Sequence, residues 1–214
     1  MYNLKRNDYY NNEKDYVVYT PDEISEFIFS VMNKEISKEL IVFDPCVGEG
    51  SLIKPWMNTG YKTIYSDIKY QGFEGTEVKD YLKLKKEDID FSPGIVLINP
   101  PFNSDEEMRK VTNEMGFGTR PFMPEVFLKK TLDLFGKNVP IVLFTPYGFR
   151  LNVVHNSKRI VKFFEKEYPE ITSIISLPKD VYEEVNFHSE IVVFNSKKTK
   201  PHYFVDIRES RRIK

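Results

Sequence analysis

The feature that most constrains the fold is an alternation of short apolar runs with longer amphipathic stretches. The apolar runs at 40–44, 94–98 and 139–146 are typical of strands buried on both faces, as in the centre of a parallel sheet. Two stretches, 20–35 before the first run and 123–137 before the third, place apolar residues at helical spacing, and the second stops at Gly136. Strands alternating with helices predict an α/β chain with a mainly parallel sheet covered by helices on both faces.

The C-terminal part of the chain changes this pattern. Three apolar runs, at 171–178, 190–195 and 202–207, read as late strands, and the last two are joined by a short connection. This favours an antiparallel end to the sheet. The expected organisation is a polar segment at 1–15, a single domain over 16–206 and a basic tail at 207–214.

The helix predicted over 20–35 has a marked start. Thr20 is a candidate N-cap, Pro21 suits the first helical position, and Glu23 completes a capping box. The apolar stripe that follows consists of Ile24, Phe27, Ile28, Val31 and Met32.

Composition excludes several classes of protein. The net charge of −1 does not suit a nucleic-acid binder that works by overall basicity, although the last nineteen residues hold seven Lys or Arg against two Asp or Glu. One cysteine, Cys46, allows no intrachain disulfide and favours no metal centre. The first fifteen residues do not resemble a signal peptide, and no stretch approaches the roughly 20 apolar residues of a membrane helix. We therefore expect a cytoplasmic protein without a membrane partner.

The first strand leads into a glycine loop, FDPCVGEGS at 43–51. Position 53 is isoleucine and no Gly-Lys-Ser/Thr follows, so the loop is neither a dinucleotide fingerprint nor a P-loop. Asp44 at the strand tip suits a cationic ligand, and Asp67 at the end of the next strand could accept both hydroxyls of a ribose. Asp80 could accept from an exocyclic amine. By itself, the loop could equally be a tight turn.

The ordered set Thr20-Pro21, Asp44-Pro-x-x-Gly-x-Gly50, Asp67, Asp80 and Asn99-Pro-Pro-Phe102 resembles the DNA adenine-N6 methyltransferases that use S-adenosylmethionine. It is most similar to those with the cofactor loop first, including type I modification subunits. The resemblance covers about 19–195 and implies a Rossmann-like, seven-stranded sheet, mainly parallel with an antiparallel end. The residues it implies for the cofactor are Tyr19, Thr20, Asp44, Pro45, Cys46, Gly48, Gly50, Asp67, Ile68, Asp80, Tyr81 and Asn99.

The residues that the resemblance implies for catalysis are Asn99, Pro100, Pro101 and Phe102. The side-chain oxygen of Asn99 and the carbonyl of Pro100 could accept the two N–H bonds of an amine and free its lone pair. The prolines restrict the backbone, which preorganises the two acceptors, and Phe102 could stack on the target base. A base in duplex DNA would first have to be flipped out.

Other readings stay open. The same motif also serves methyltransferases of rRNA bases and of protein glutamine, and a non-catalytic S-adenosylmethionine-binding or anti-restriction protein is a further alternative. The sequence has no evident target-recognition domain, so a separate recognition subunit or other protein partner could supply DNA specificity. The segment 103–122, with Arg120, could be a lid or a short surface helix. Phe187 and His188 could line a base pocket or be an ordinary core and surface residue.

Overall fold

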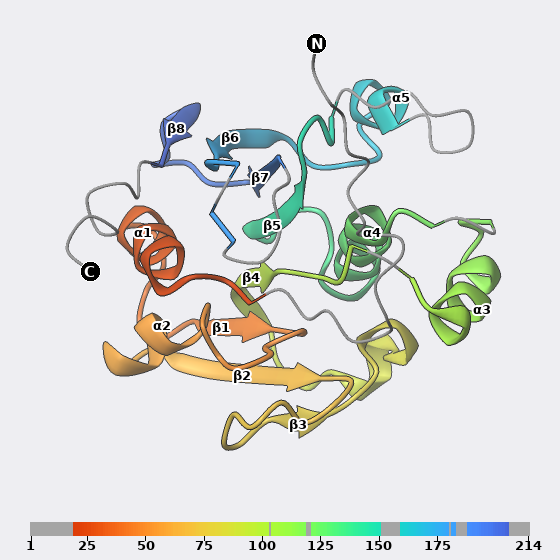
Figure 1. The fold of residues 1–214 in the computed structure, drawn as a ribbon, viewed down its shortest axis with the longest axis horizontal. Helices are drawn as coiled ribbons and strands as arrows, with labels where there is room; N and C mark the ends of the chain where they lie inside the picture. The colour runs from red at the N-terminus through yellow and green to blue at the C-terminus, as the bar shows by residue number, and fades with distance from the viewer. Residues whose placement is uncertain are drawn as a thin grey trace, which may run out of the picture.

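The computed structural model describes residues 19–102, 104–118, 121–150, 159–179, 181–182 and 188–205. Its centre is an eight-stranded sheet with the order β3-β2-β1-β4-β5-β7-β6-β8 (Figure 1). The strands are β1 (Ile41–Asp44), β2 (Lys62–Asp67), β3 (Glu77–Val78), β4 (Pro93–Ile98), β5 (Ile141–Pro146), β6 (Ile171–Ser176), β7 (Ser189–Phe194) and β8 (His202–Phe204). The first seven correspond to the expected Rossmann-like sheet, and β8 is added at its edge.

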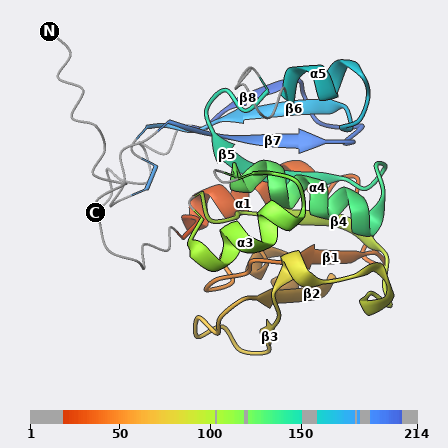
Figure 2. The same ribbon diagram turned by 90° about the vertical axis from the view of Figure 1, so that its right-hand side faces the viewer.

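Strand direction confirms a mainly parallel sheet with an antiparallel end. The strands β1 to β5 pair in parallel, and β7 runs antiparallel between β5 and β6. Figure 2 shows β1 and β7 pointing in opposite directions (Figure 2). The closing strand β8 is parallel to its neighbour β6, so within the described strands the antiparallel character comes from β7 alone.

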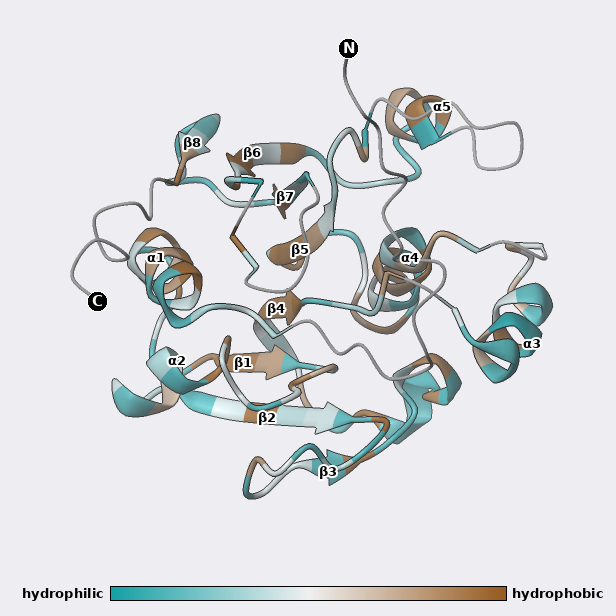
Figure 3. Ribbon diagram, in the orientation of Figure 1, coloured by the Kyte–Doolittle hydropathy of each residue, from teal (hydrophilic) through white to brown (hydrophobic). Residues whose placement is uncertain are grey.

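Helices cover both faces of the sheet (Figure 1). The helices are α1 (Asp22–Met32), α2 (Lys54–Asn58), α3 (Glu106–Glu114), α4 (Met123–Phe135) and α5 (Arg159–Phe164), with 3-10 turns η2 (Tyr81–Lys83) and η3 (Lys86–Asp88). Helices α1 and α2 lie on one face, and α4 and α5 lie on the other. Figure 3 shows apolar central strands and a largely hydrophilic α3, which agrees with its place at the surface (Figure 3).

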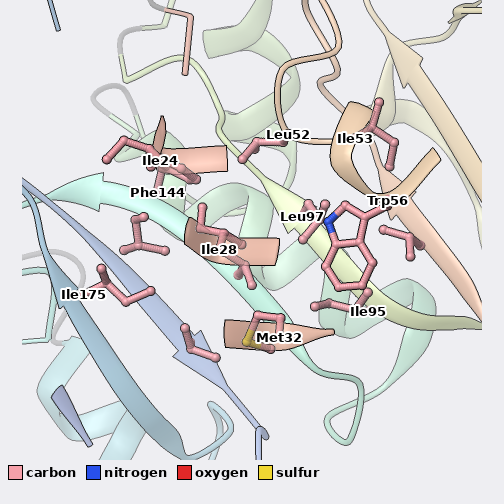
Figure 4. Packing of buried hydrophobic residues seen from close by; sticks show 14 of the residues in the cluster. Ile24, Ile28, Met32, Leu52, Ile53, Trp56, Ile95, Leu97, Phe144 and Ile175 are labelled. Carbon is pink, nitrogen blue, oxygen red and sulfur yellow. The ribbon is translucent and has the colours of Figure 1, made fainter. Parts of the chain in front are cut away.

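Alternation along the strands divides the core between these two faces. Ile95 and Leu97 of β4 point to the α1 side, where they meet Ile24, Ile28 and other residues around the fully buried Trp56 (Figure 4). Val96 and Ile98 of the same strand point to the α4 side. Because both faces are buried, a central strand needs apolar residues at every position, which explains the continuous runs in the sequence.

The predicted start of the first helix is wrong. The helix α1 begins at Asp22 with Pro21 in the N-cap position, and no side chain caps its N–H groups. Thr20 is buried and its hydroxyl contacts a distant strand end instead, so the capping box with Glu23 does not form. In contrast, α4 confirms the predicted helix that stops at Gly136, where φ is +81°.

Several expectations fall in other parts of the chain. The segment 103–122 contains the helix α3, as one of its two readings predicted, while Arg120 lies outside the described residues. The segments 1–15 and 207–214 also lie outside them, so the domain boundaries stay predictions. Among the described helices, each is too short or too polar to cross a membrane.

Candidate functional site

The site lies where the carboxyl ends of β1, β2 and β4 meet. Asp44 ends β1, Asp67 ends β2, and Asn99 directly follows β4. Because β1 lies between β2 and β4 and all three run in parallel, these residues share one edge of the sheet. The three motifs predicted from sequence are thus brought together by the sheet order.

The glycine loop is held by hydrogen bonds to β1 and β2. Its backbone N–H at Cys46 donates to Asp44 Oδ1 over 3.1 Å, and the N–H of Gly48 donates to Asp67 Oδ2 over 2.9 Å. The N–H of Val47 donates to the carbonyl of Ser66 over 3.0 Å. Two acidic side chains at neighbouring strand ends therefore fix the loop before any ligand binds.

The two glycines of the loop have different roles. Both have positive φ, +54° at Gly48 and +84° at Gly50, a region that favours glycine. A Cβ on Gly50 would lie 2.5 Å from the ring of Phe73, so this glycine makes room for a protein side chain. A Cβ on Gly48 would lie 3.4 Å from the ring of Tyr19. Only Gly50 is therefore required by a close contact within the protein, and at Gly48 the positive φ is the reason for glycine.

Asp44 has the most unusual electrostatic environment in the site. It is 1% exposed, and burial raises its pKa to about 8, with the Cys46 N–H opposing the rise and Asp67 adding to it. Its Oδ2 atom is buried and has no hydrogen-bond partner among the described residues. A buried carboxylate oxygen without a donor costs free energy, and a cationic or N–H-bearing ligand would compensate for it.

The end of β2 carries two further candidates. The second oxygen of Asp67, Oδ1, accepts from the N–H of Lys69 over 3.1 Å, so both oxygens already have one donor and keep lone pairs for another. Ile68, between them, is 42% exposed at the sheet edge. An exposed apolar side chain beside a carboxylate could cover the flat face of a ribose-linked ring.

The next segment, at Asp80 and Tyr81, differs more from expectation. Asp80 caps η2 by accepting from the N–H of Leu82 over 3.0 Å, and its Oδ2 pairs with Lys83 over 3.2 Å. The side chain of Tyr81 is buried beneath α4 and bonds to Thr131 over 2.8 Å. Its burial raises the pKa of the Tyr81 hydroxyl. The Tyr81 side chain is therefore a core group, and only its backbone remains available at this edge.

Asn99 connects the two halves of the site. Its Nδ2 donates to the hydroxyl of Thr20 over 2.9 Å, and its backbone N–H bonds to the thiol of Cys46. Burial, then the charges of Asp44 and Asp67, raise the pKa of that thiol, so it stays neutral. The first bond reaches the segment before α1 and the second reaches the glycine loop.

The rest of the Asn-Pro-Pro-Phe motif follows at the same edge. Pro45, in the glycine loop, and Pro100 are buried, whereas Pro101 is exposed. Phe102 is partly buried and packs against the core cluster on the α1 side. Pro100 and Pro101 thus lie where the chain leaves β4, with the ring of Pro100 buried and that of Pro101 at the surface.

Near the antiparallel end, the structure adds Glu190, which the sequence did not indicate, and places one of the two residues predicted there. Glu190 of β7 accepts from the N–H groups of Gly148 and Phe149, each over 3.1 Å, and so fixes the turn after β5 at this edge. His188 is exposed beside Tyr147, with ring centroids 6.4 Å apart. Phe187 lies outside the described residues. These contacts depend on the antiparallel register of β5 and β7, which leaves no local signal in the sequence.

No protein-family model and no curated protein matches the sequence. Solved structures do match. A type I restriction-modification methyltransferase subunit from Streptococcus thermophilus superposes with a TM-score of 0.60 at 16% identity, covering 92% of this chain and 49% of that one. A protein from Listeria monocytogenes assigned to the class I S-adenosylmethionine-dependent methyltransferases gives 0.61 at 16%, covering 91% and 69%.

A third match is a protein from Pyrococcus horikoshii assigned as an RNA methyltransferase, with a TM-score of 0.54 at 17% identity, covering 88% of this chain and 90% of that one. At these identities, the matches establish that the chain has the class I methyltransferase fold. The chain spans about half the length of the type I modification subunits that it matches.

Proposed function

We propose that the protein transfers a methyl group from S-adenosylmethionine to the N6 amine of adenine in DNA. The observation that carries this proposal is the position of Asn99. Asn99 directly follows β4, where its side-chain amide donates to Thr20 and its backbone N–H faces Cys46 of the glycine loop. A binding protein would not need an amide and a proline carbonyl at this point.

The chain's own groups fit the cofactor. S-adenosylmethionine, when bound, supplies an electrophilic methyl group on a positively charged sulfonium. Asp44, with its unpartnered Oδ2, would hold a cationic part of this molecule, and Asp67 would accept from the ribose hydroxyls. Asp80 would accept from the adenine amine of the cofactor, and its ion pair with Lys83 would compete with that contact. The described residues thus offer acceptors at separate points along the sheet edge.

The proposed role of Asn99 and Pro100 is to accept the two N–H bonds of the target amine. Drawing both protons toward fixed acceptors pulls the nitrogen toward tetrahedral geometry and localises its lone pair for attack. The N–C bond would form as the bond between the methyl carbon and the sulfonium sulfur breaks, leaving a neutral thioether, and the methylated nitrogen would release one proton to solvent. The acceptors are preorganised because the strand end and the buried Pro100 fix the backbone. Phe102 would stack on the flipped base, a contact worth about 1–3 kcal/mol.

DNA is favoured by the similarity to type I modification subunits, one of which comes from a structure that describes assembly of a type I restriction-modification system. We extend this to a DNA substrate and to a partner subunit that supplies recognition, because that structure describes an assembled system. RNA is the second candidate, because the chain also matches nearly the full length of a protein assigned as an RNA methyltransferase.

The test is transfer of a labelled methyl group from S-adenosylmethionine to DNA, RNA and protein from the same cells. We expect label on adenine N6 of DNA, lost in Asn99→Ala while S-adenosylmethionine binding persists. Asn138→Ala is the matched control, because Asn138 is exposed in the turn before β5, at the opposite end of the strands. Label on RNA or on glutamine would show that the proposed substrate, DNA, is wrong. Methyl transfer by Asn99→Ala would refute the proposed role of Asn99.

A further inference from the structure

We infer that Thr20 is a positioning residue that fixes which atom of the Asn99 side-chain amide faces the substrate. This inference rests on the proposed function. The terminal torsion of an asparagine side chain is broad and nearly two-fold, so its oxygen and nitrogen can exchange places at little cost. An acceptor for an amine must present Oδ1. The neighbours of the amide therefore decide whether the site is competent.

The contact that selects this orientation joins residues 79 positions apart in the sequence. In the structure the Thr20 hydroxyl accepts from Asn99 Nδ2 over 2.9 Å. A hydroxyl can also donate, but in the direction that the structure has, Oδ1 points away from Thr20 and is left to accept from another group. Thr20 is 5% exposed, so water cannot easily replace the hydroxyl as acceptor.

Thr20 is itself held from both sides. On its C-terminal side, the carbonyl of Pro21 accepts from the N–H groups of Ile24 and Ser25, and Ile24 is fully buried against the sheet. On its N-terminal side, the ring of Tyr19 packs over Gly48 of the glycine loop. A hydroxyl supported by a helix start and a packed ring has little freedom to move.

A plain helix-capping role does not account for Thr20. Among the described residues, no side chain caps the N-terminus of α1, and the Thr20 hydroxyl bonds instead to the motif at the end of β4. Two short motifs with no sequence relation to each other thus meet through one hydrogen bond. The backbone N–H of Asn99 faces the thiol of Cys46 in the glycine loop, so the main chain at Asn99 is held on the loop side while Thr20 holds its side-chain amide.

Thr20→Val and Thr20→Ser form the decisive pair. Valine keeps the branched shape and removes the acceptor, whereas serine keeps the hydroxyl. At saturating S-adenosylmethionine, we expect Thr20→Val to slow single-turnover methyl transfer by about three- to tenfold, the effect of one lost neutral hydrogen bond. The dissociation constant for the cofactor, measured on the same variants, separates this positioning role from the cofactor contact that the resemblance implies for Thr20: the rate at saturation should fall by more than the affinity, and Thr20→Ser should restore most of the rate. Thr63→Val, on β2, controls for a general effect of the substitution.

A second readout needs neither cofactor nor substrate. In the 1H–15N spectrum of the side-chain amides, the Asn99 signal, assigned by its loss in Asn99→Ala, should shift in Thr20→Val and keep its position in Thr20→Ser. A rate and a signal unchanged in Thr20→Val would overturn the inference. So would equal losses in the valine and serine variants, or a loss confined to cofactor affinity. If the wild-type protein transfers no methyl group to DNA, RNA or protein, the proposed function fails as well.

Discussion

Replacing Asp44 with asparagine should change how the stability of the protein depends on pH. The pKa of Asp44 rises from the ordinary value of about 3.9 to about 8 on folding, because the side chain is buried. A folded pKa above the unfolded one means that the folded state binds the proton more tightly. The contribution that protonated Asp44 makes to the free energy of unfolding is therefore fully present below about pH 4 and is lost as pH rises through 8.

The magnitude follows from linkage. One pKa unit corresponds to about 1.4 kcal/mol, so the wild-type protein should lose up to about 4 kcal/mol of unfolding free energy between pH 5 and 8 through this group. Asparagine carries no charge, and Asp44→Asn should lack this loss. Its amide leaves a buried donor without a partner, which costs about 1–3 kcal/mol at every pH. The slope with pH and the constant offset therefore separate the two effects.

Denaturant unfolding of both proteins at several pH values from 5 to 9 measures this difference. We expect the stability of Asp44→Asn relative to wild type to increase steadily with pH. Asp133→Asn, in an exposed pair with Lys129 on α4, should run parallel to the wild type. A free-energy difference between Asp44→Asn and wild type that stays constant over this range would refute the argument from burial.

Two further substitutions test packing around the site. Gly50→Ala should destabilise the protein more than Gly60→Ala. Both glycines have φ above +80°, and the backbone strain common to both variants should cost about 1–3 kcal/mol in denaturant unfolding. Only at position 50 would the added Cβ also lie against Phe73. Glu125→Gln should cost about 3–5 kcal/mol, since it leaves Arg159 buried without the carboxylate that lies 2.9 Å away. Replacing Glu125 and Arg159 together by Leu and Met should recover only part of the second loss, because Lys162 and Tyr168 also lose the acceptor that they share at Glu125 Oε1. Equal stability of the single and double variants would contradict this reasoning.

The sequence by itself determined the elements and the order of the motifs. Apolar runs predicted β1, β4 and β5 because strands buried on both faces need apolar side chains at every position. Gly136 marked the end of α4 because its positive φ is a local property of the backbone. Periodicity and turn chemistry act over a few residues, so a linear pattern can report them.

Only the tertiary structure decided which residues of the different motifs contact one another. The local pattern predicted Thr20 as a helix cap, besides the cofactor contact that the resemblance implies, whereas the fold buries it against Asn99, 79 residues away. The resemblance implied a cofactor contact for Tyr81, whereas packing under α4 gives its hydroxyl to Thr131. A buried polar side chain pairs with a group that the fold brings within reach, because a buried donor or acceptor without a partner costs free energy. That choice depends on which strands become neighbours, and sheet order is not written in any local stretch of the chain.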